Sequence, residues 1–112
     1  MPKQAAKLDR VFQALTDPTR RAVVQRLCRG PAPMSELARP FRMALPSFAQ
    51  HLGVLERCGL IRSHKAGRVR TYHLTPRPLQ VAEHWVATQR RVWDRRLDQL
   101  DDYLKSLKEQ QR

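Results

Sequence analysis

The chain has little of what marks a secreted or membrane protein. It contains two cysteines among 112 residues, Cys28 and Cys58, and these are too few and too far apart to predict a disulfide framework. No apolar run is long enough to cross a bilayer, and the N-terminus lacks the apolar segment of a signal peptide. We therefore expect a reduced, cytoplasmic protein with no membrane segment.

The groupings of a metal centre or a catalytic site are also missing. The sequence has no Cys-x-x-Cys and no His-x-x-His spacing, although it contains four histidines. It shows no activated nucleophile, no glycine loop for phosphate and no carboxylate pair held in a pocket. The aspartates near the C-terminus have the spacing of a solvated helix face, namely Asp94, Asp98, Asp101 and Asp102. The sequence predicts no enzyme, no metal site and no cofactor.

Acidic residues are scarce in the first two thirds of the chain. Residues 1–77 carry 15 Lys and Arg against 4 Asp and Glu, whereas residues 78–112 carry 7 against 6. A positive excess of this kind indicates a polyanionic partner. Nucleic acid is the expected partner, and an anionic membrane surface is the alternative.

Three short helices are predicted before residue 41. The first begins near Leu8, after a polar start that we expect to be frayed. Asp17 suits the cap of the second helix and Pro18 its first position. Ser35 suits the cap of the third helix, and Pro40 stops it. The second helix carries arginines that either keep its surface soluble or contact nucleic acid: Arg20, Arg21, Arg26 and Arg29.

The segment from Leu45 to Cys58 predicts a further helix, the candidate reader of DNA. Phe48, Leu52 and Leu55 recur at i, i+4 and i+7, so they share one inward face. The opposite face carries Ser47, Gln50, His51, Val54 and Arg57. Such a face suits a helix in a major groove, and it also suits an ordinary solvated helix.

Two residues weaken this predicted helix. Ala44 stands where a capping Ser or Thr is expected, which costs about 1 kcal/mol of helix stability. Gly53 lies in the middle of the helix and costs roughly 1 kcal/mol relative to alanine. Either another group lies close to the backbone at Gly53, or the helix simply tolerates a glycine at this position.

A basic β-hairpin, or wing, is predicted at residues 60–74. Residues 60–65 form one strand, Ala66-Gly67-Arg68 the turn and residues 69–74 the returning strand, with the period-2 pattern of a half-buried strand. Its positive and imidazole side chains are Arg62, His64, Lys65, Arg68 and Arg70, and no acidic residue lies between Arg57 and Arg77. Such a hairpin is favourable beside phosphates. The alternative is a sheet edge that its basic residues merely protect.

The last predicted helix covers residues 78–108. Its apolar residues include a heptad-like series at spacings of 4, 3, 4 and 3, formed by Trp93, Leu97, Leu100, Leu104 and Leu107. The expected dimer interface consists of Trp85, Val92, Trp93, Leu97, Leu100 and Leu104. The alternative is that this helix folds back on its own domain.

Three segments together resemble the ArsR-type winged helix-turn-helix repressors. They are LTDPTRRAVVQRL at 15–27, MSELARPFRMALPSFAQHLGVLERCGLI at 34–61 and GRVRTYHL at 67–74. The tail HWVATQRRVWDRRLDQLDDYLKSLK resembles a subgroup in which a W…W-x-x-R-L-x-x-L pattern closes the dimer. The resemblance implies a mainly α fold with a small β-hairpin, in a single domain of residues 1–112. Within it, 8–77 form the DNA-binding core, with the wing at 60–74, and 78–108 form the C-terminal dimerisation helix.

The resemblance also implies a transcriptional regulator that binds an inverted repeat in double-stranded DNA as a homodimer, with one reading helix in each of two successive major grooves. Ser47, Gln50 and His51 match the DNA-facing positions, and the amide of Gln50 can pair with adenine. Arg42 is expected to reach a base or a phosphate at the helix start. The wing residues that match backbone-contacting positions are Lys65, Arg68 and Arg70.

Several points stay open at this stage. Gly53 stands where relatives often carry Arg or Lys, and SELARP lacks the cysteines of the metal sensors. Cys28 is expected in the core, whereas Cys58 lies near Arg57 and offers a redox switch. A small-molecule inducer of unknown identity and the choice between activator and repressor are both open. The alternative function is a non-specific DNA-binding architectural or protein-interaction module. RNA binding is a weaker third option, because the chain lacks exposed paired aromatics suited to stacking bases.

Overall fold

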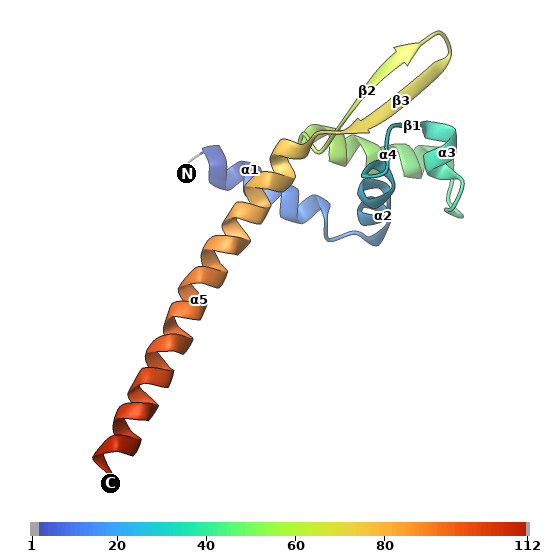
Figure 1. Ribbon diagram of the computed structural model, residues 1–112. Helices are drawn as coiled ribbons and strands as arrows, with labels where there is room; N and C mark the ends of the chain where they lie inside the picture. The colour runs from blue at the N-terminus through green and yellow to red at the C-terminus, as the bar shows by residue number, and fades with distance from the viewer. Residues whose placement is uncertain (1–2, 112) are drawn as a thin grey trace. The chain divides into compact units, whose positions relative to one another are not determined.

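Figure 1 shows a computed structural model of the chain, in which residues 3–111 are described. The elements are α1 (Lys3–Ala14), α2 (Pro18–Leu27), β1 (Ala32–Pro33), α3 (Met34–Ala38), α4 (Leu45–Arg57), β2 (Ile61–Ala66), β3 (Val69–Leu74) and α5 (Pro76–Gln110). The predicted mainly α fold with a winged helix-turn-helix is confirmed. The chain divides into two compact units after Ala82, within α5.

Helix α2 starts as its sequence predicts. The carboxylate of Asp17 accepts the backbone N–H of Arg20 at 3.1 Å, and Pro18 occupies the first helical position. This bond satisfies one of the N–H groups that a helix leaves free at its start. The cap and the proline together fix where α2 begins.

Helix α1 begins earlier than predicted, at Lys3 instead of near Leu8. This stretch consists of Lys, Gln and Ala, which are all good helix formers. They therefore extend the helix without contributing an apolar face. Met1 and Pro2, part of the predicted frayed start, lie outside the described residues.

A third strand that the sequence analysis missed joins the hairpin. Ala32 pairs with Tyr72 and Pro33 with Thr71, which gives an antiparallel sheet in the order β1-β3-β2. A proline is compatible with an edge strand, where its missing N–H is not needed. Pro33 also precedes α3, so the prediction that Ser35 caps this helix is wrong.

The hairpin itself is close to its prediction. β3 has the predicted bounds, and β2 begins at Ile61, one residue later than expected. The turn narrows to Gly67 and Arg68, and Gly67 adopts a φ of +63° that a residue with a side chain rarely adopts. In Figure 1 the two strands form one long ribbon pair, with β1 beside β3 near its base.

Helix α4 buries the face that its spacing predicts. Phe48, Leu52 and Leu55 are at most 1% exposed, and burying each such side chain contributes about 1.5–3 kcal/mol. The core around them is drawn from every other element of the first unit: Val11, Ala14, Val23, Val24, Leu27, Ala32, Leu37, Leu60, Ile61, Tyr72 and Ala82. α4 is therefore the central helix of this unit.

The prediction that Cys28 lies in the core is wrong, because its side chain is exposed. Helix α2 buries Val23, Val24 and Leu27, and it ends at Leu27. Cys28 is the C-cap, one residue beyond the last buried position of the helix.

In the second unit, α5 continues to Gln110 and most of its large apolar side chains are exposed. The helix starts two residues before the predicted position, because prolines are well accommodated in a first helical turn. Among the described residues, no helix is both long enough and apolar enough to span a membrane.

Candidate nucleic-acid interface

The exposed face of α4 begins with Ser47 and Gln50, which both lie on the surface. Because they are exposed, their side chains are accessible to a large partner. Ala44 occupies the N-cap with no side-chain cap bond, as predicted. The first N–H groups of α4 therefore lack a side-chain acceptor from the cap residue.

The turn before α4 presents Arg42 to solvent. The ring of Phe41 stacks on that of Phe48, with centroids 5.5 Å apart. Phe41 and Met43 both pack against the core, whereas Arg42 between them is exposed. Two inward neighbours thus hold Arg42 outward beside the start of the reading helix.

His51 is half-buried and faces α2. Its Nδ1 lies 3.1 Å from Nη1 of Arg20 and 3.7 Å from Oδ2 of Asp17. Val54, one helical turn further, packs partly against the core instead of lying on an open polar face. The predicted outer stripe of α4 therefore divides, with Ser47 and Gln50 outward and His51 and Val54 against neighbouring helices.

Arg20 has a role that the sequence analysis did not identify. Its Nε donates to the carbonyl oxygen of Ala14 at 2.6 Å, and its Nη2 donates to that of Gln13 at 3.4 Å. Nη1 of Arg21 donates to the carbonyl oxygen of Leu15 at 2.8 Å. These arginines donate to carbonyls at and just after the end of α1, where the helix supplies no N–H partner, and the carbonyl of Gln13 also accepts from the N–H and the hydroxyl of Thr16. The sequence signal for this role is the short connection between α1 and α2, which places both arginine side chains within reach of the carbonyl oxygens at the end of α1.

Asp17 lies in the same cluster. Burial alone raises the pKa of its carboxyl, but the N–H of Arg20 and the charges of His51 and Arg20 outweigh this effect. The net result is a pKa below the ordinary value of 3.8. Asp17 therefore stays charged and continues to cap α2 well into the acidic range.

Arg26 and Glu36 join α2 to α3. Nη2 of Arg26 donates to Oε1 of Glu36 at 2.9 Å, and Nη1 donates to the carbonyl oxygen of Gly30 at 3.2 Å. The hydrogen bond and the charge of Arg26 lower the pKa of the Glu36 carboxyl. This ion pair helps to set the position of α3 in the helix-turn-helix, so Arg26 has a structural contact and is not only a solubilising group.

The wing carries positive charge along both of its faces. Lys65 and Arg70 are direct cross-strand partners, and Nη1 of Arg70 donates to Oγ of Ser63 at 3.0 Å. Arg62 and His64 alternate with these residues along β2, and the ring of His64 lies 6.2 Å from that of His73. Arg68 is exposed in the turn. The structure therefore gathers Lys65, Arg68 and Arg70 at the far end of the hairpin.

All of the predicted dimer-interface residues are exposed in the single chain. Trp93 is 61% exposed and Leu100 52%. The same holds for the rest of the set: Trp85, Val92, Leu97 and Leu104. An apolar helix face of this size is unusual on the surface of an isolated chain.

Neither cysteine is part of a larger ligand group. Among the described residues, no three His, Cys, Asp or Glu side chains converge as a metal site. Sγ of Cys58 donates to the carbonyl oxygen of Leu55 at 3.3 Å. The arrangement supplies a surface that suits a polyanion, with the exposed polar side chains Ser47 and Gln50 on α4 and positive charges on the wing.

Residues 15–64 match a family model described as a helix-turn-helix domain. The chain is 47% identical over 68 residues to the HTH-type transcriptional regulator Rv2034 of Mycobacterium tuberculosis, and the match covers 61% of this chain and 64% of that regulator. It is 32% identical over 79 residues to the transcriptional repressor SdpR of Bacillus subtilis, with 70% and 88% covered. The crystal structure of an ArsR family transcriptional regulator has a TM-score of 0.78 at 53% identity, and the match covers 84% of this chain and 97% of that one.

Proposed function

Because the chain belongs to the ArsR family of DNA-binding transcriptional regulators, we propose that it is a repressor that binds an inverted-repeat operator in double-stranded DNA as a homodimer. Ser47 and Gln50 read bases in the major groove, and Arg42 contacts a base or phosphate at the start of α4. Lys65, Arg68 and Arg70 contact the DNA backbone. His51 contributes to DNA binding by orienting α4 against α2 and by direct contact with the DNA.

The observation that carries this proposal is the pairing of an exposed α4 face with a strongly basic wing. The exposed amide of Gln50 suits bidentate recognition of adenine, and Lys and Arg on β2 and β3 suit phosphates. No acidic residue lies between Arg57 and Arg77 to offset the charge of the wing. Base readout and backbone attraction are thus supplied by different elements.

The homodimer is supported by the exposed apolar residues of α5. A second copy of the same helix would cover Trp93, Leu97 and Leu100, whose heptad-like spacing suits helix pairing. A dimer also presents two reading helices, which is what a two-fold operator requires. The repressor SdpR is the named relative that supports repression over activation.

The test is binding of the purified protein to its own upstream DNA and to random duplex, by fluorescence anisotropy at two salt concentrations. We expect two chains per site and a preference for the upstream DNA of about a thousandfold or more. The affinity for both duplexes falls as salt rises, because bound cations release counterions from the phosphates. Equal affinity for both duplexes, and for sites selected from random DNA, contradicts the proposal.

A non-specific DNA-binding module is the second candidate, and the charge on both faces of the wing favours it. That arrangement attracts any phosphate backbone without reading bases. The comparison of the two duplexes separates the two candidates, because a non-specific module binds the upstream DNA and the random duplex with equal affinity at each salt concentration.

A further inference from the structure

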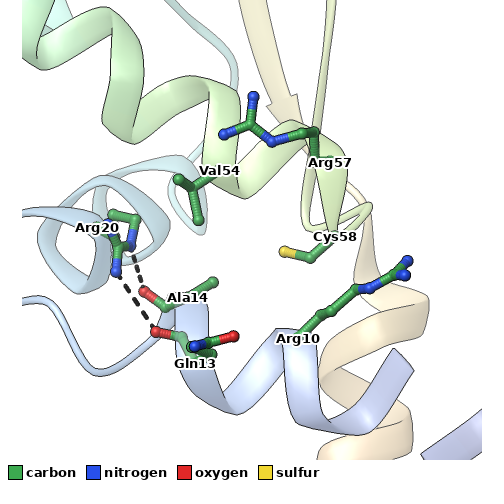
Figure 2. A pocket seen from close by; sticks show the side chains of 7 residues that line it. All are labelled: Arg10, Gln13, Ala14, Arg20, Val54, Arg57 and Cys58. Atoms are coloured by element: carbon green, nitrogen blue, oxygen red, sulfur yellow. Dashed lines mark hydrogen bonds between the residues drawn. The ribbon is translucent and has the colours of Figure 1, made fainter. Parts of the chain in front are cut away.

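An open cleft of about 670 Å³ lies between α1, α2 and α4, within the first unit. Figure 2 labels the seven side chains that line it. None of them is Ser47, Gln50 or a wing residue, so the cleft is separate from the proposed base-reading and backbone contacts. Its volume is in the range of small-molecule sites in proteins, about 300–1,000 Å³.

The charge of the cleft comes from three arginines on three different helices. Arg10 is on α1, Arg20 on α2 and Arg57 on α4, and no acidic residue lines the cleft. Arg20 is already engaged with carbonyl oxygens of α1, as the dashed lines in Figure 2 show. Within the described part of the chain, no hydrogen bond or ion pair engages the guanidinium of Arg10 or Arg57. These two groups are therefore available to an anion.

The remaining lining is partly apolar. Ala14 is fully buried, Val54 is partly buried against the core, and the thiol of Cys58 is directed to the carbonyl oxygen of Leu55. Gln13 adds an amide at the edge. The cleft thus combines an apolar wall with cationic groups, a combination that suits a ligand with both an apolar body and a negative charge.

The side chain of Arg57 lies back along α4 beside Gly53. A Cβ built at Gly53 would stand 3.4 Å from Nη1 of Arg57, which is a van der Waals contact. In Figure 2 the guanidinium of Arg57 extends from the end of α4 toward Val54.

We propose that the cleft binds a small amphipathic carboxylate. The exposed side chains of Arg10 and Arg57, which extend from opposite sides of the cleft in Figure 2, turn toward the carboxylate to hold it, and Val54 contacts its apolar part. Guanidinium groups match carboxylates because they donate two parallel hydrogen bonds. Divalent cations are disfavoured by the three positive charges of the lining.

The same ligand regulates DNA binding, and this part rests on the proposed function. Val54 and Arg57 are on the C-terminal half of α4, whereas Ser47 and Gln50 are on its N-terminal half. Arg20 lines the cleft and also contacts His51 in the middle of α4. A ligand that bridges α1 and α4 changes how α4 is held, so its binding and DNA binding are coupled.

The first experiment uses the full chain without DNA. Octanoate is titrated by isothermal calorimetry, with 1-octanol as the uncharged counterpart, on the wild type and on Arg10→Gln, Arg57→Gln and the double variant. We expect saturable octanoate binding with a Kd of about 1 mM or tighter. Each single variant weakens it by about fivefold or more, the double variant by over about tenfold, and octanol binds at least about tenfold more weakly.

The matched control is Arg39→Gln, which removes one exposed arginine outside the cleft and is expected to leave octanoate binding unchanged. Circular dichroism verifies that every variant is folded. Absence of saturable binding, or equal binding by wild type and the double variant, overturns the proposal.

The second experiment repeats the DNA titration with saturating octanoate. We expect octanoate to change the DNA affinity of the wild type by about fivefold or more and to leave that of the double variant unchanged. If the double variant loses DNA affinity and octanoate does not bind, the cleft belongs to the DNA backbone and the proposal fails. If octanoate binds but DNA affinity is unaffected, the regulatory part is wrong. Octanoate binding without any sequence-specific DNA binding leaves the cleft assignment intact and refutes the proposed function instead.

Discussion

Nη1 of Arg20 lies 3.1 Å from Nδ1 of His51, and this contact joins α2 to the middle of the reading helix. A guanidinium can only donate, so this contact is a hydrogen bond in the tautomer in which Nδ1 of His51 carries no proton and accepts. The other nitrogens of Arg20 hold the end of α1. One side chain therefore connects three helices of the first unit and fixes how α4 is presented.

Replacing Arg20 tests this connection. Arg20→Gln is expected to lower the free energy of unfolding by about 1–3 kcal/mol. The hydrogen bonds from the charged guanidinium are lost, and the carbonyl oxygens of α1 lose that donor. Urea denaturation measures the change. Arg29→Gln, at an exposed position just after α2, is the control and is expected to change stability by no more than about 0.5 kcal/mol. Equal losses for both variants would contradict the role of Arg20.

Asp17 gives a prediction for acidic pH. Asp17→Ala is expected to lower the free energy of unfolding by about 1 kcal/mol at pH 7, through loss of the α2 cap. The pKa of Asp17 is lowered in the folded protein, so its charge-dependent stabilisation is full above the ordinary value of 3.8 and is lost as the pH falls through the folded value.

The difference between wild type and Asp17→Ala should therefore shrink as the pH falls below about 4, measured by thermal unfolding at a series of pH values. Asp9→Ala, an exposed position on α1, is the control. A difference that is independent of pH down to the acid-unfolding limit would show that the charge of Asp17 is not involved.

Gly53→Ala is expected to stabilise the protein by up to about 1 kcal/mol, because alanine reduces the entropy cost of the helix interior. The added Cβ meets only the flexible end of Arg57 at 3.4 Å. Gly59→Ala is the counterpart and should destabilise the protein by about 1–2 kcal/mol, since Gly59 has a φ of +79°. Thermal unfolding of both variants measures the contrast. A destabilised Gly53→Ala would mean that the Arg57 guanidinium cannot move.

The proposed roles of α4 in base readout and of the wing in backbone contact are testable in DNA binding. Gln50→Ala is expected to lose about 1–3 kcal/mol of discrimination between operator and random duplex, because its amide reads a base edge. Arg68→Ala should weaken binding to both duplexes alike and reduce the salt dependence of the affinity by about one phosphate contact. Anisotropy titrations with both duplexes measure the two effects. If both variants lose operator and random binding equally, the assignment of roles is wrong.

Association through α5 is testable in solution. Leu100→Asp is expected to convert the dimer to monomer, because a charge at the centre of the apolar face must be desolvated in a helix pair. Gln99→Asp, next to Leu100 but outside the heptad series, is the control and should stay dimeric. Sedimentation equilibrium at matched concentrations distinguishes them. A wild type that is monomeric at micromolar concentration, or dimers for both variants, would exclude this interface.

Local patterns in the sequence were sufficient to predict much of the fold. The spacing of Phe48, Leu52 and Leu55 predicts the buried face of α4, and Asp17-Pro18 predicts the start of α2, because both patterns depend only on helix geometry. β1 was missed because its pairing of Ala32 with Tyr72 depends on a distant strand. Residues next to two prolines have no local preference that reveals such a partner.

The candidate site was predicted unevenly for the same reason. Gln50 and the wing residues are exposed, as the alternation and the helical period indicate. His51 has the same local pattern as Gln50, but the structure turns it toward Arg20 on another helix. The cleft beside Arg10 and Arg57 could not be predicted, since its lining residues come from three separate segments.

The small sheet has two open edges, and both are poor templates for a further strand. On one edge, Pro33 of β1 has no N–H to offer to an incoming chain. On the other, β2 presents Arg62 and Lys65, whose charges disfavour the approach of another β2 strand. An extended hairpin can thereby project from the first unit without edge-to-edge aggregation, and the arginine and lysine residues proposed to contact phosphates also keep neighbouring copies of the sheet apart.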